Sequence, residues 1–201
     1  MRVLIGCEES QAVTKAFRAK GHIAYSCDIK ETRGNHKWHF CCDVMDALDR
    51  GQWDLVILHP DCTAMAVSGN RWYGTGMPKN YARNDAVKWT LALWAKAIEH
   101  SHRVALENPV SVIFSHLNNV QYIQPWMFGH GESKKTGIAL HNLPLLKPTQ
   151  VVDGREQRVW RMPPGPNRKR DRSVTYAGIA DAMATQWGAL GNDAASTVEG
   201  E

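Results

Sequence analysis

The chain has 201 residues, five cysteines and a formal net charge of +4 at pH 7, and 43% of its residues are hydrophobic. These values are typical of a globular protein with one core, and no apolar run is long enough for a membrane span or a signal peptide. The cysteines are irregularly spaced and two are adjacent, which argues against a disulfide framework and favours a reducing, cytoplasmic environment.

Hydrophobic periodicity predicts strands that alternate with helices, which indicates a parallel sheet covered on both faces. Short continuous apolar runs are typical of buried parallel strands. The clearest helix carries an apolar stripe of Val87, Leu91, Trp94, Ala95 and Ile98. In chain order, the predicted elements are a strand over 2–5, a helix from Ser10 to Gly21, a strand over 22–27, a strand over 53–58, a helix over 85–101, a strand over 103–106 and a final helix ended by Gly188.

The end of the chain differs from the rest in composition. The final helix places Ile179, Ala182, Met183 and Trp187 on one apolar face. The following residues are small, polar and acidic, which is typical of disorder. We therefore expect one domain over 1–190 and a disordered tail over 191–201.

Much of the positive charge lies in one segment, residues 155–172, which also holds Trp160 and three prolines. Because proline fixes φ and removes a backbone donor, we expect a loop rather than a regular helix. A basic loop with an aromatic residue suits contacts with phosphates and stacked bases, and a solvated surface loop is the alternative. The seven basic residues of this segment are Arg155, Arg158, Arg161, Arg168, Lys169, Arg170 and Arg172.

Three predicted strands are followed by segments rich in polar residues. Residues 6–10 follow the first strand, 60–63 follow the central strand and 107–109 follow the next. Ligands of open α/β sheets bind beyond the carboxyl ends of the strands. We therefore expect these segments to converge in one site.

These motifs, in this order, resemble those of the cytosine-C5 DNA methyltransferases, and more closely their small, phage-associated members. The resemblance rests on the glycine turn at 6–10, Asp28 after the second strand, and the segments 59–63, 106–109 and 172–180. It covers most of the first 190 residues. It implies a Rossmann-like class I S-adenosylmethionine-dependent methyltransferase fold, an α/β fold with a mostly parallel sheet and helices on both faces. It also implies DNA as the substrate, with a free cytidine nucleotide as the second choice.

The resemblance also implies a set of catalytic residues. Cys62 is the nucleophile that adds to C6 of cytosine and makes C5 reactive. Glu107 hydrogen-bonds the exocyclic amine and N3 of the flipped base, and Asn108 fixes the loop that carries Glu107. Arg158 belongs to a partial echo of the family's glutamine–arginine–arginine motif.

The methyl donor, S-adenosylmethionine, is placed by the same resemblance over the first two strand ends. Asp28 is expected on its ribose hydroxyls and Asp43 on its adenine amine. Glu8 and Glu9 are candidates for its amino group, and Pro60 holds the cysteine loop beside it. The full set of expected donor-binding residues is Gly6, Glu8, Glu9, Ser10, Asp28, Asp43 and Pro60.

The sequence departs from the family's pattern in three respects. Asp61 stands directly before Cys62, where the family has proline, and a carboxylate there raises the pKa of a neighbouring thiol. The first loop lacks the family's glycine-rich signature, and we see no room for a target-recognition domain. We therefore expect low sequence specificity, another substrate, or recognition by a partner protein. A homodimer is possible. The alternative function is an inactive protein of this fold that binds nucleic acid or a partner protein through 155–172.

Two other motifs carry less weight. His36, His39, Cys41 and Cys42 are possible zinc ligands, but adjacent cysteines rarely match the spacing of structural sites, so we expect no metal. Residues 133–137 contain two lysines but lack the glycines of a phosphate loop, which leaves these lysines available for nucleic-acid phosphates.

Overall fold

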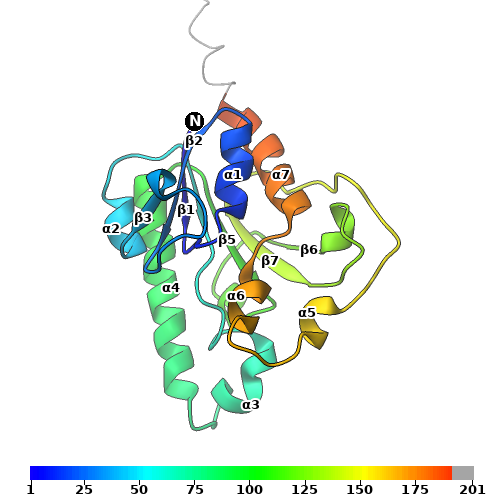
Figure 1. Ribbon diagram of the computed structural model, residues 1–201. Helices are drawn as coiled ribbons and strands as arrows, with labels where there is room; N and C mark the ends of the chain where they lie inside the picture. Colours follow the sequence, from blue (N-terminus) through cyan, green and yellow to red (C-terminus); the bar gives the residue numbers. More distant parts are fainter. Residues whose placement is uncertain (192–201) are drawn as a thin grey trace, which may run out of the picture.

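The computed structural model describes residues 1–191, which form one seven-stranded sheet with the order β3-β2-β1-β4-β5-β7-β6. Neighbouring strands from β3 to β5 are parallel, and β7 runs antiparallel to both of its neighbours (Figure 1). The strands are β1 (Arg2–Gly6), β2 (Ile23–Asp28), β3 (His39–Cys41), β4 (Leu55–Leu58), β5 (Val104–Pro109), β6 (Val120–Ile123) and β7 (Thr136–His141). The helices are α1 (Ala12–Ala19), α2 (Val44–Leu48), α3 (Asn70–Tyr73), α4 (Asn80–His100), α5 (Arg158–Arg161), α6 (Arg168–Ser173) and α7 (Ala177–Gln186).

This arrangement is the Rossmann-like class I methyltransferase fold, and the predicted fold class is confirmed. Helices cover both faces of the sheet because successive side chains of a strand point to opposite faces. Val3 and Ile5 of β1 pack in the core beneath α1 and α7, whereas Leu4 packs in the core beneath α2 and α4. None of the helices within residues 1–191 is long and apolar enough to cross a membrane.

The four strands predicted from apolar runs correspond to β1, β2, β4 and β5, with shifted ends. The predicted face of the final helix is confirmed, since Ile179, Ala182, Met183 and Trp187 are all buried. Strands β3, β6 and β7 were not predicted, because their runs are short or mixed in polarity. The end of the tail, residues 192–201, lies outside the described part of the chain, so the expected disorder there stays a prediction.

The long helix α4 differs from its prediction. It begins at Asn80 rather than Asp85, and its most buried side chains include Thr90, Leu93 and Ala97, whereas Ala95 is exposed. Arg83 is also buried, because its guanidinium donates to the carbonyls of neighbouring segments. The predicted apolar stripe therefore identified the buried face of α4 only in part.

The expected loop over 155–172 is partly helical. Two short helices, α5 and α6, lie within it, and its three prolines all fall in the connection between them. The prolines therefore separate two short helices rather than prevent helix formation. The first helix of the chain also begins differently from its prediction: Gln11, at φ 59°, occupies the N-cap position that was expected for Ser10.

Candidate active site

The three segments expected at one site do converge at the carboxyl edge of the sheet, the lower end of the sheet in Figure 1. The backbone N–H of His59 donates to the Gly6 carbonyl at 2.9 Å, which joins the ends of β1 and β4. The Asn108 side-chain amide donates to the Pro60 carbonyl at 2.9 Å, which joins β5 to the cysteine loop. The second bond is buried, so it fixes the cysteine loop against the end of β5.

Cys62 lies half-buried in a tight turn after β4. Its carbonyl accepts hydrogen bonds from the backbone N–H groups of Met65 and Ala66. Burial raises the pKa of the thiol, and the negative charges of Asp61 and Glu107 raise it further, against an opposing effect of Lys134. The thiol is therefore protonated near neutral pH and needs a base or a new cation to become a nucleophile.

Asp61 is ionised and paired. Its Oδ1 accepts hydrogen bonds from the backbone and the hydroxyl of Thr63, and Lys169 of α6 lies 2.9 Å from its Oδ2. Burial acts to raise the pKa of Asp61, but these bonds outweigh it and hold the pKa below its usual value. The basic segment therefore reaches the cysteine loop and partly offsets the charge beside Cys62.

Glu107 forms a buried pair with His59, a residue that the sequence interpretation missed. His59 Nδ1 lies 3.0 Å from Glu107 Oε2, and the two side chains are 10% and 15% exposed. Burial acts to raise the pKa of Glu107, but His59 and Lys134 outweigh it, so the pKa lies below its usual value. The one available signal for His59 was its place between a buried strand and Pro60.

Two buried polar atoms beside this pair have no hydrogen-bond partner among the described residues, namely His59 Nε2 and Asn108 Oδ1. Unpaired buried polar groups are costly and rare, so they mark places where a polar ligand atom would be stabilised. His59 directly follows β4, and Asn108 lies near the end of β5. The His59–Glu107 pair and the neighbouring Asn108 form a polar environment suited to a planar base with donors and acceptors on one edge.

The acids expected to hold a donor's amino group have other partners. The buried carboxylate of Glu8 accepts from the backbone N–H groups of Val13 and Thr14 and from the Thr14 hydroxyl, so it caps α1. Glu9 pairs with Arg33 at 2.7 Å. The Ser10 hydroxyl accepts a long bond, at 3.3 Å, from the backbone N–H of Ala12 at the start of α1. The geometry therefore does not support a ligand contact by Glu8, because both of its oxygens are already used.

Asp28 ends β2 and Asp43 follows β3, and the charges of both act on Cys7. The pKa of the Cys7 thiol is raised to about 12, mainly by burial and then by the charges of Asp28, Asp43 and Asp61. Asp28 accepts through Oδ1 from the N–H of Lys30, and Asp43 caps α2 through Oδ1. Each carboxylate thus keeps its Oδ2 outside these bonds and available to a donor.

Gly6 has a packing role that the sequence did not predict. A Cβ at this position would lie 2.6 Å from Cγ2 of Val44 and 2.9 Å from Cδ2 of Leu58. A larger residue would therefore force Val44 or Leu58 to move, so the glycine leaves room for α2 to pack against the sheet, whether or not a ligand approaches it.

The basic segment is divided between two places. Lys169 pairs with Asp61, and the charge of Cys62 affects the pKa of Arg172, so α6 lies beside the cysteine loop. Arg158 instead donates to Glu132 at 2.9 Å, and Tyr176 donates to the other oxygen of Glu132. The predicted catalytic role of Arg158 therefore has no support from its contacts. Of the remaining four, Arg155 lies over the Trp126 ring, Arg168 donates to the Met162 carbonyl, Arg170 adjoins Asp171, and Arg161 is exposed.

A pocket of about 480 Å³ lies beside the basic segment. It is lined by Arg158, Arg172 and Tyr176 together with Ala12 of α1 and Ala180 of α7. It therefore adjoins α6, the same helix that contacts the cysteine loop.

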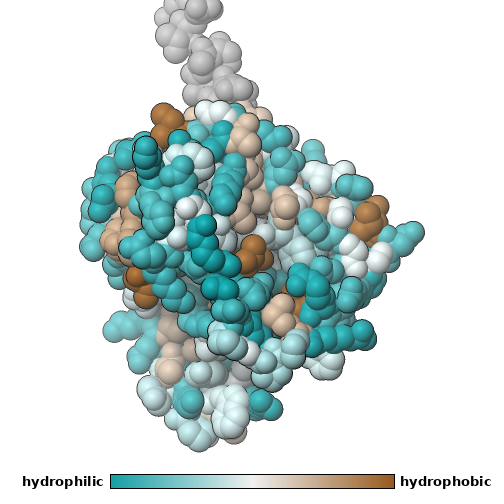
Figure 2. Space-filling view, viewed as in Figure 1, coloured by the Kyte–Doolittle hydropathy of each residue, from teal (hydrophilic) through white to brown (hydrophobic). Residues whose placement is uncertain are grey.

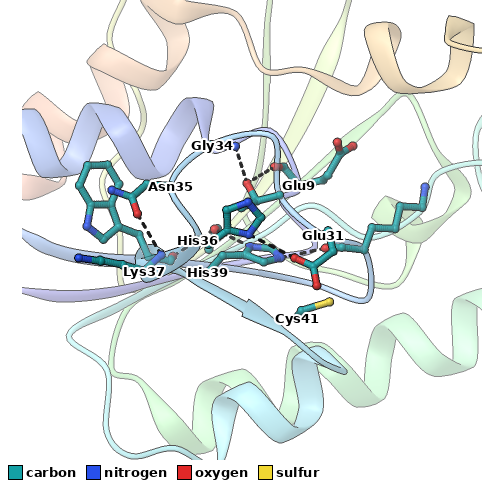
Figure 3. A network of polar contacts seen from close by, with 12 residues as sticks. Glu9, Glu31, Gly34, Asn35, His36, Lys37, His39 and Cys41 are labelled. Carbon is teal, nitrogen blue, oxygen red and sulfur yellow. Dashed lines mark hydrogen bonds and ion pairs between the residues drawn. The ribbon is translucent and has the colours of Figure 1, made fainter.

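The possible zinc ligands are occupied by hydrogen bonds. Figure 3 shows His36 beside Glu31, with its Nδ1 3.3 Å from the carboxylate. The two ring nitrogens of His39 lie within hydrogen-bond distance of the Ser26 hydroxyl and the Lys30 carbonyl. Among the residues that the structure describes, no three His, Cys, Asp or Glu side chains are grouped to hold a metal ion.

No protein-family model and no curated protein matches the sequence. Among solved structures, the chain is similar to a protein described as a DNA modification methyltransferase of an E. coli prophage, with 9% identity, a TM-score of 0.47, and coverage of 76% of this chain and 52% of that one. It is similar to the S. pombe Dnmt2 methyltransferase, with 15% identity, a TM-score of 0.47, and coverage of 80% and 53%. It is also similar to the Entamoeba histolytica methyltransferase EhMeth, with 10% identity, a TM-score of 0.48, and coverage of 79% and 58%. The chain thus spans little more than half the length of these structures.

Proposed function

We propose that this protein is an S-adenosylmethionine-dependent methyltransferase that modifies carbon 5 of cytosine in DNA, with Cys62 as the nucleophile. The observation that carries the proposal is the pairing of a cysteine loop with a buried, ionised Glu107 at the ends of adjacent parallel strands. The bond from Asn108 to the Pro60 carbonyl holds the two together. In this proposal the chain is a small member of the cytosine-C5 DNA methyltransferase family, of the phage-associated type.

Cys62 acts first in the proposed reaction. Its sulfur bonds to C6 of cytosine, and the electron pair of the C5–C6 double bond makes C5 nucleophilic. C5 would then take the methyl group from the donor's sulfonium sulfur, which leaves as a neutral thioether. Loss of the C5 proton to a solvent base, with expulsion of the Cys62 thiolate, would restore the C5–C6 double bond. The raised pKa of Cys62 means that its proton must leave as the substrate binds. Lys134 and Arg172 are the nearby cations that stabilise the resulting thiolate.

Glu107 and His59 hold the base. The Glu107 carboxylate accepts from the exocyclic amine, and His59, whose Nδ1 lies 3.0 Å from Glu107 Oε2, holds that carboxylate in place. The unsatisfied His59 Nε2 and Asn108 Oδ1 fit this role because a bound base would give them polar partners.

S-adenosylmethionine would supply the methyl group. The free oxygens of Asp28 and Asp43 fit its ribose hydroxyls and adenine amine, which are donors. The carboxylate of Glu8 caps α1, so we assign it no contact with the donor. Pro60 keeps its proposed role, since its carbonyl fixes the cysteine loop.

The proposal is tested by transfer of radiolabelled methyl groups to duplex DNA, single-stranded DNA, RNA and deoxycytidine nucleotides. We expect label on carbon 5 of cytosine, its loss in Cys62→Ser, and its retention in Cys41→Ser, which changes an exposed cysteine. Absence of transfer to every substrate, with no binding of the donor in calorimetry, would exclude the methyltransferase function.

A second function is favoured by one observation, the raised pKa of Cys62 between two carboxylates. In this alternative the protein is inactive and binds nucleic acid or a partner protein through the basic segment 155–172. Cys62→Ser would then leave binding unchanged, whereas replacing Arg161 and Arg168 by Glu would weaken it and reduce its dependence on salt.

A further inference from the structure

An ordered projection follows the cysteine loop. Residues 67–81, here called the aromatic arm, comprise α3, the turn after it and the first residues of α4. Figure 1 shows them at the lower end of the molecule, the same end as α5 and α6. The arm exposes four large side chains: Val67 (43%), Trp72 (52%), Met77 (40%) and Tyr81 (67%).

The base of the arm is fixed to the candidate site. The buried guanidinium of Arg83 donates to the carbonyls of Ala64 and Ala66 and to the side-chain oxygen of Asn70. The backbone N–H of Val67 donates to the carbonyl of Val110, just beyond Glu107 and Asn108. The arm is therefore held in place relative to the end of β5, so it does not need to be ordered when a ligand arrives.

The charge of the arm fits an anionic partner. No Asp or Glu occurs within residues 67–81, whereas Arg71 and Lys79 do. The Arg71 guanidinium lies 5.3 Å from the centre of the Trp72 ring. In Figure 2 the lower end of the molecule is mostly pale, whereas the body above it is largely teal with hydrophilic side chains. Aromatic rings beside cations and free of acids are the pattern that stacks on nucleic-acid bases.

We propose that the aromatic arm binds an unpaired nucleic-acid strand, with Trp72 and Tyr81 stacking on bases that flank the target cytosine. The proposal rests on the proposed function and names its substrate as single-stranded. Bases within a duplex are already stacked on both faces, so exposed rings gain most from bases that are not paired. The stacking is independent of base identity, which agrees with a chain that shows no separate target-recognition domain within residues 1–191.

The test compares binding of a fluorescent single-stranded oligonucleotide and of its duplex by anisotropy, without the methyl donor. We expect the single strand to bind more tightly, and Trp72→Ala to weaken it roughly 5- to 100-fold, the range for loss of one stacked base. Trp72→Phe should restore most of the affinity because it keeps a ring. Trp89→Ala, which removes a 39% exposed Trp elsewhere on α4, is the matched control and should bind as the native protein does.

A second measurement separates stacking from charge. The slope of log affinity against log salt should be unchanged in Trp72→Ala, because no phosphate contact is lost. Tighter binding of the duplex, or an affinity of Trp72→Ala within twofold of the native protein, would overturn the arm's role. If the arm fails this test, the native protein can still transfer methyl groups, and the proposed function stands. If the native protein transfers no methyl group but binds the single strand through Trp72, the proposed function is rejected and the arm is supported.

Discussion

The two halves of the carboxyl edge are built differently. At the ends of β1 to β3, acids satisfy nearby backbone N–H groups: Glu8 caps α1, Asp43 caps α2 and Asp28 stabilises a turn. At the ends of β4 and β5, acids instead contact side chains from distant parts of the chain, as Glu107 does with His59 and Asp61 does with Lys169. Glu9, after β1, is an exception in the first half, because it pairs with Arg33. An acid after a strand is therefore not by itself a ligand.

The difference has a consequence for where chemistry can occur. Both carboxylate oxygens of Glu8 are held by local donors, whereas Asp28 and Asp43 each keep one oxygen outside such bonds. A contact between two side chains far apart in the sequence can be replaced when a ligand brings other donors, because only those two side chains have to move. The reactive half of the edge is therefore the half formed by β4 and β5.

The largest effect is expected from His59→Phe, which removes the partner of the buried Glu107. In the native protein, His59 and Lys134 outweigh burial and lower the pKa of Glu107. The ionised carboxylate therefore adds stability above its unfolded pKa of about 4.3, and this stability is lost as pH falls through the lower folded pKa. Without His59, burial favours the protonated form, so we expect a loss of roughly 3 kcal/mol at pH 7 and a much smaller loss at pH 4.

Urea denaturation of native and variant protein at the two pH values measures this difference. His116→Phe, at an exposed histidine, is the control and should change stability little at either pH. Equal losses at pH 4 and pH 7 in His59→Phe would mean that shape rather than charge joins the two residues.

A smaller loss is expected in the other half of the edge, from Glu8→Ala. The change leaves two N–H groups of α1 and the Thr14 hydroxyl without their acceptor. We expect the free energy of unfolding to fall by about 2 kcal/mol, with donor binding retained in the folded protein. Thermal unfolding and calorimetry check the two parts, with Glu9→Ala as the matched variant. A loss of donor binding without a loss of stability would instead make Glu8 a ligand.

The smallest effect is expected from Asp61→Asn. After burial, the charge of Asp61 is the main cause of the raised pKa of Cys62, so the change should lower that pKa. We expect alkylation of Cys62 at pH 8 to become severalfold faster, with the difference vanishing at a pH where both thiols are ionised. Peptide mass spectrometry, with the exposed Cys41 as internal reference, measures the rate. An unchanged ratio of the two rates would show that Lys169 already neutralises Asp61.

The convergence of the strand ends could be predicted from sequence because it depends on local patterns. Apolar runs such as Leu55–Leu58 identify buried strands, and parallel strands bring their ends to one edge. The partners at that edge could not be predicted in the same way. His59 and Glu107 are 48 residues apart, and nothing near either residue specifies the other. The cap formed by Glu8 was missed because an acid after a glycine turn suits a helix and a ligand equally well.

The reversed direction of β7 decides which end of that strand serves the site. Because β7 is antiparallel to β5, Thr136 pairs with Pro109, so the chain enters β7 at the carboxyl edge and leaves it at the opposite one. Lys134, two residues before the strand, is thereby delivered beside Cys62 and Glu107. The chain must then travel back along the sheet before the basic segment can reach Asp61. The reversed strand therefore lets two segments of the chain, one before β7 and one after it, place cations beside the same cysteine loop. An insertion between these two segments would lengthen the connection without displacing Lys134.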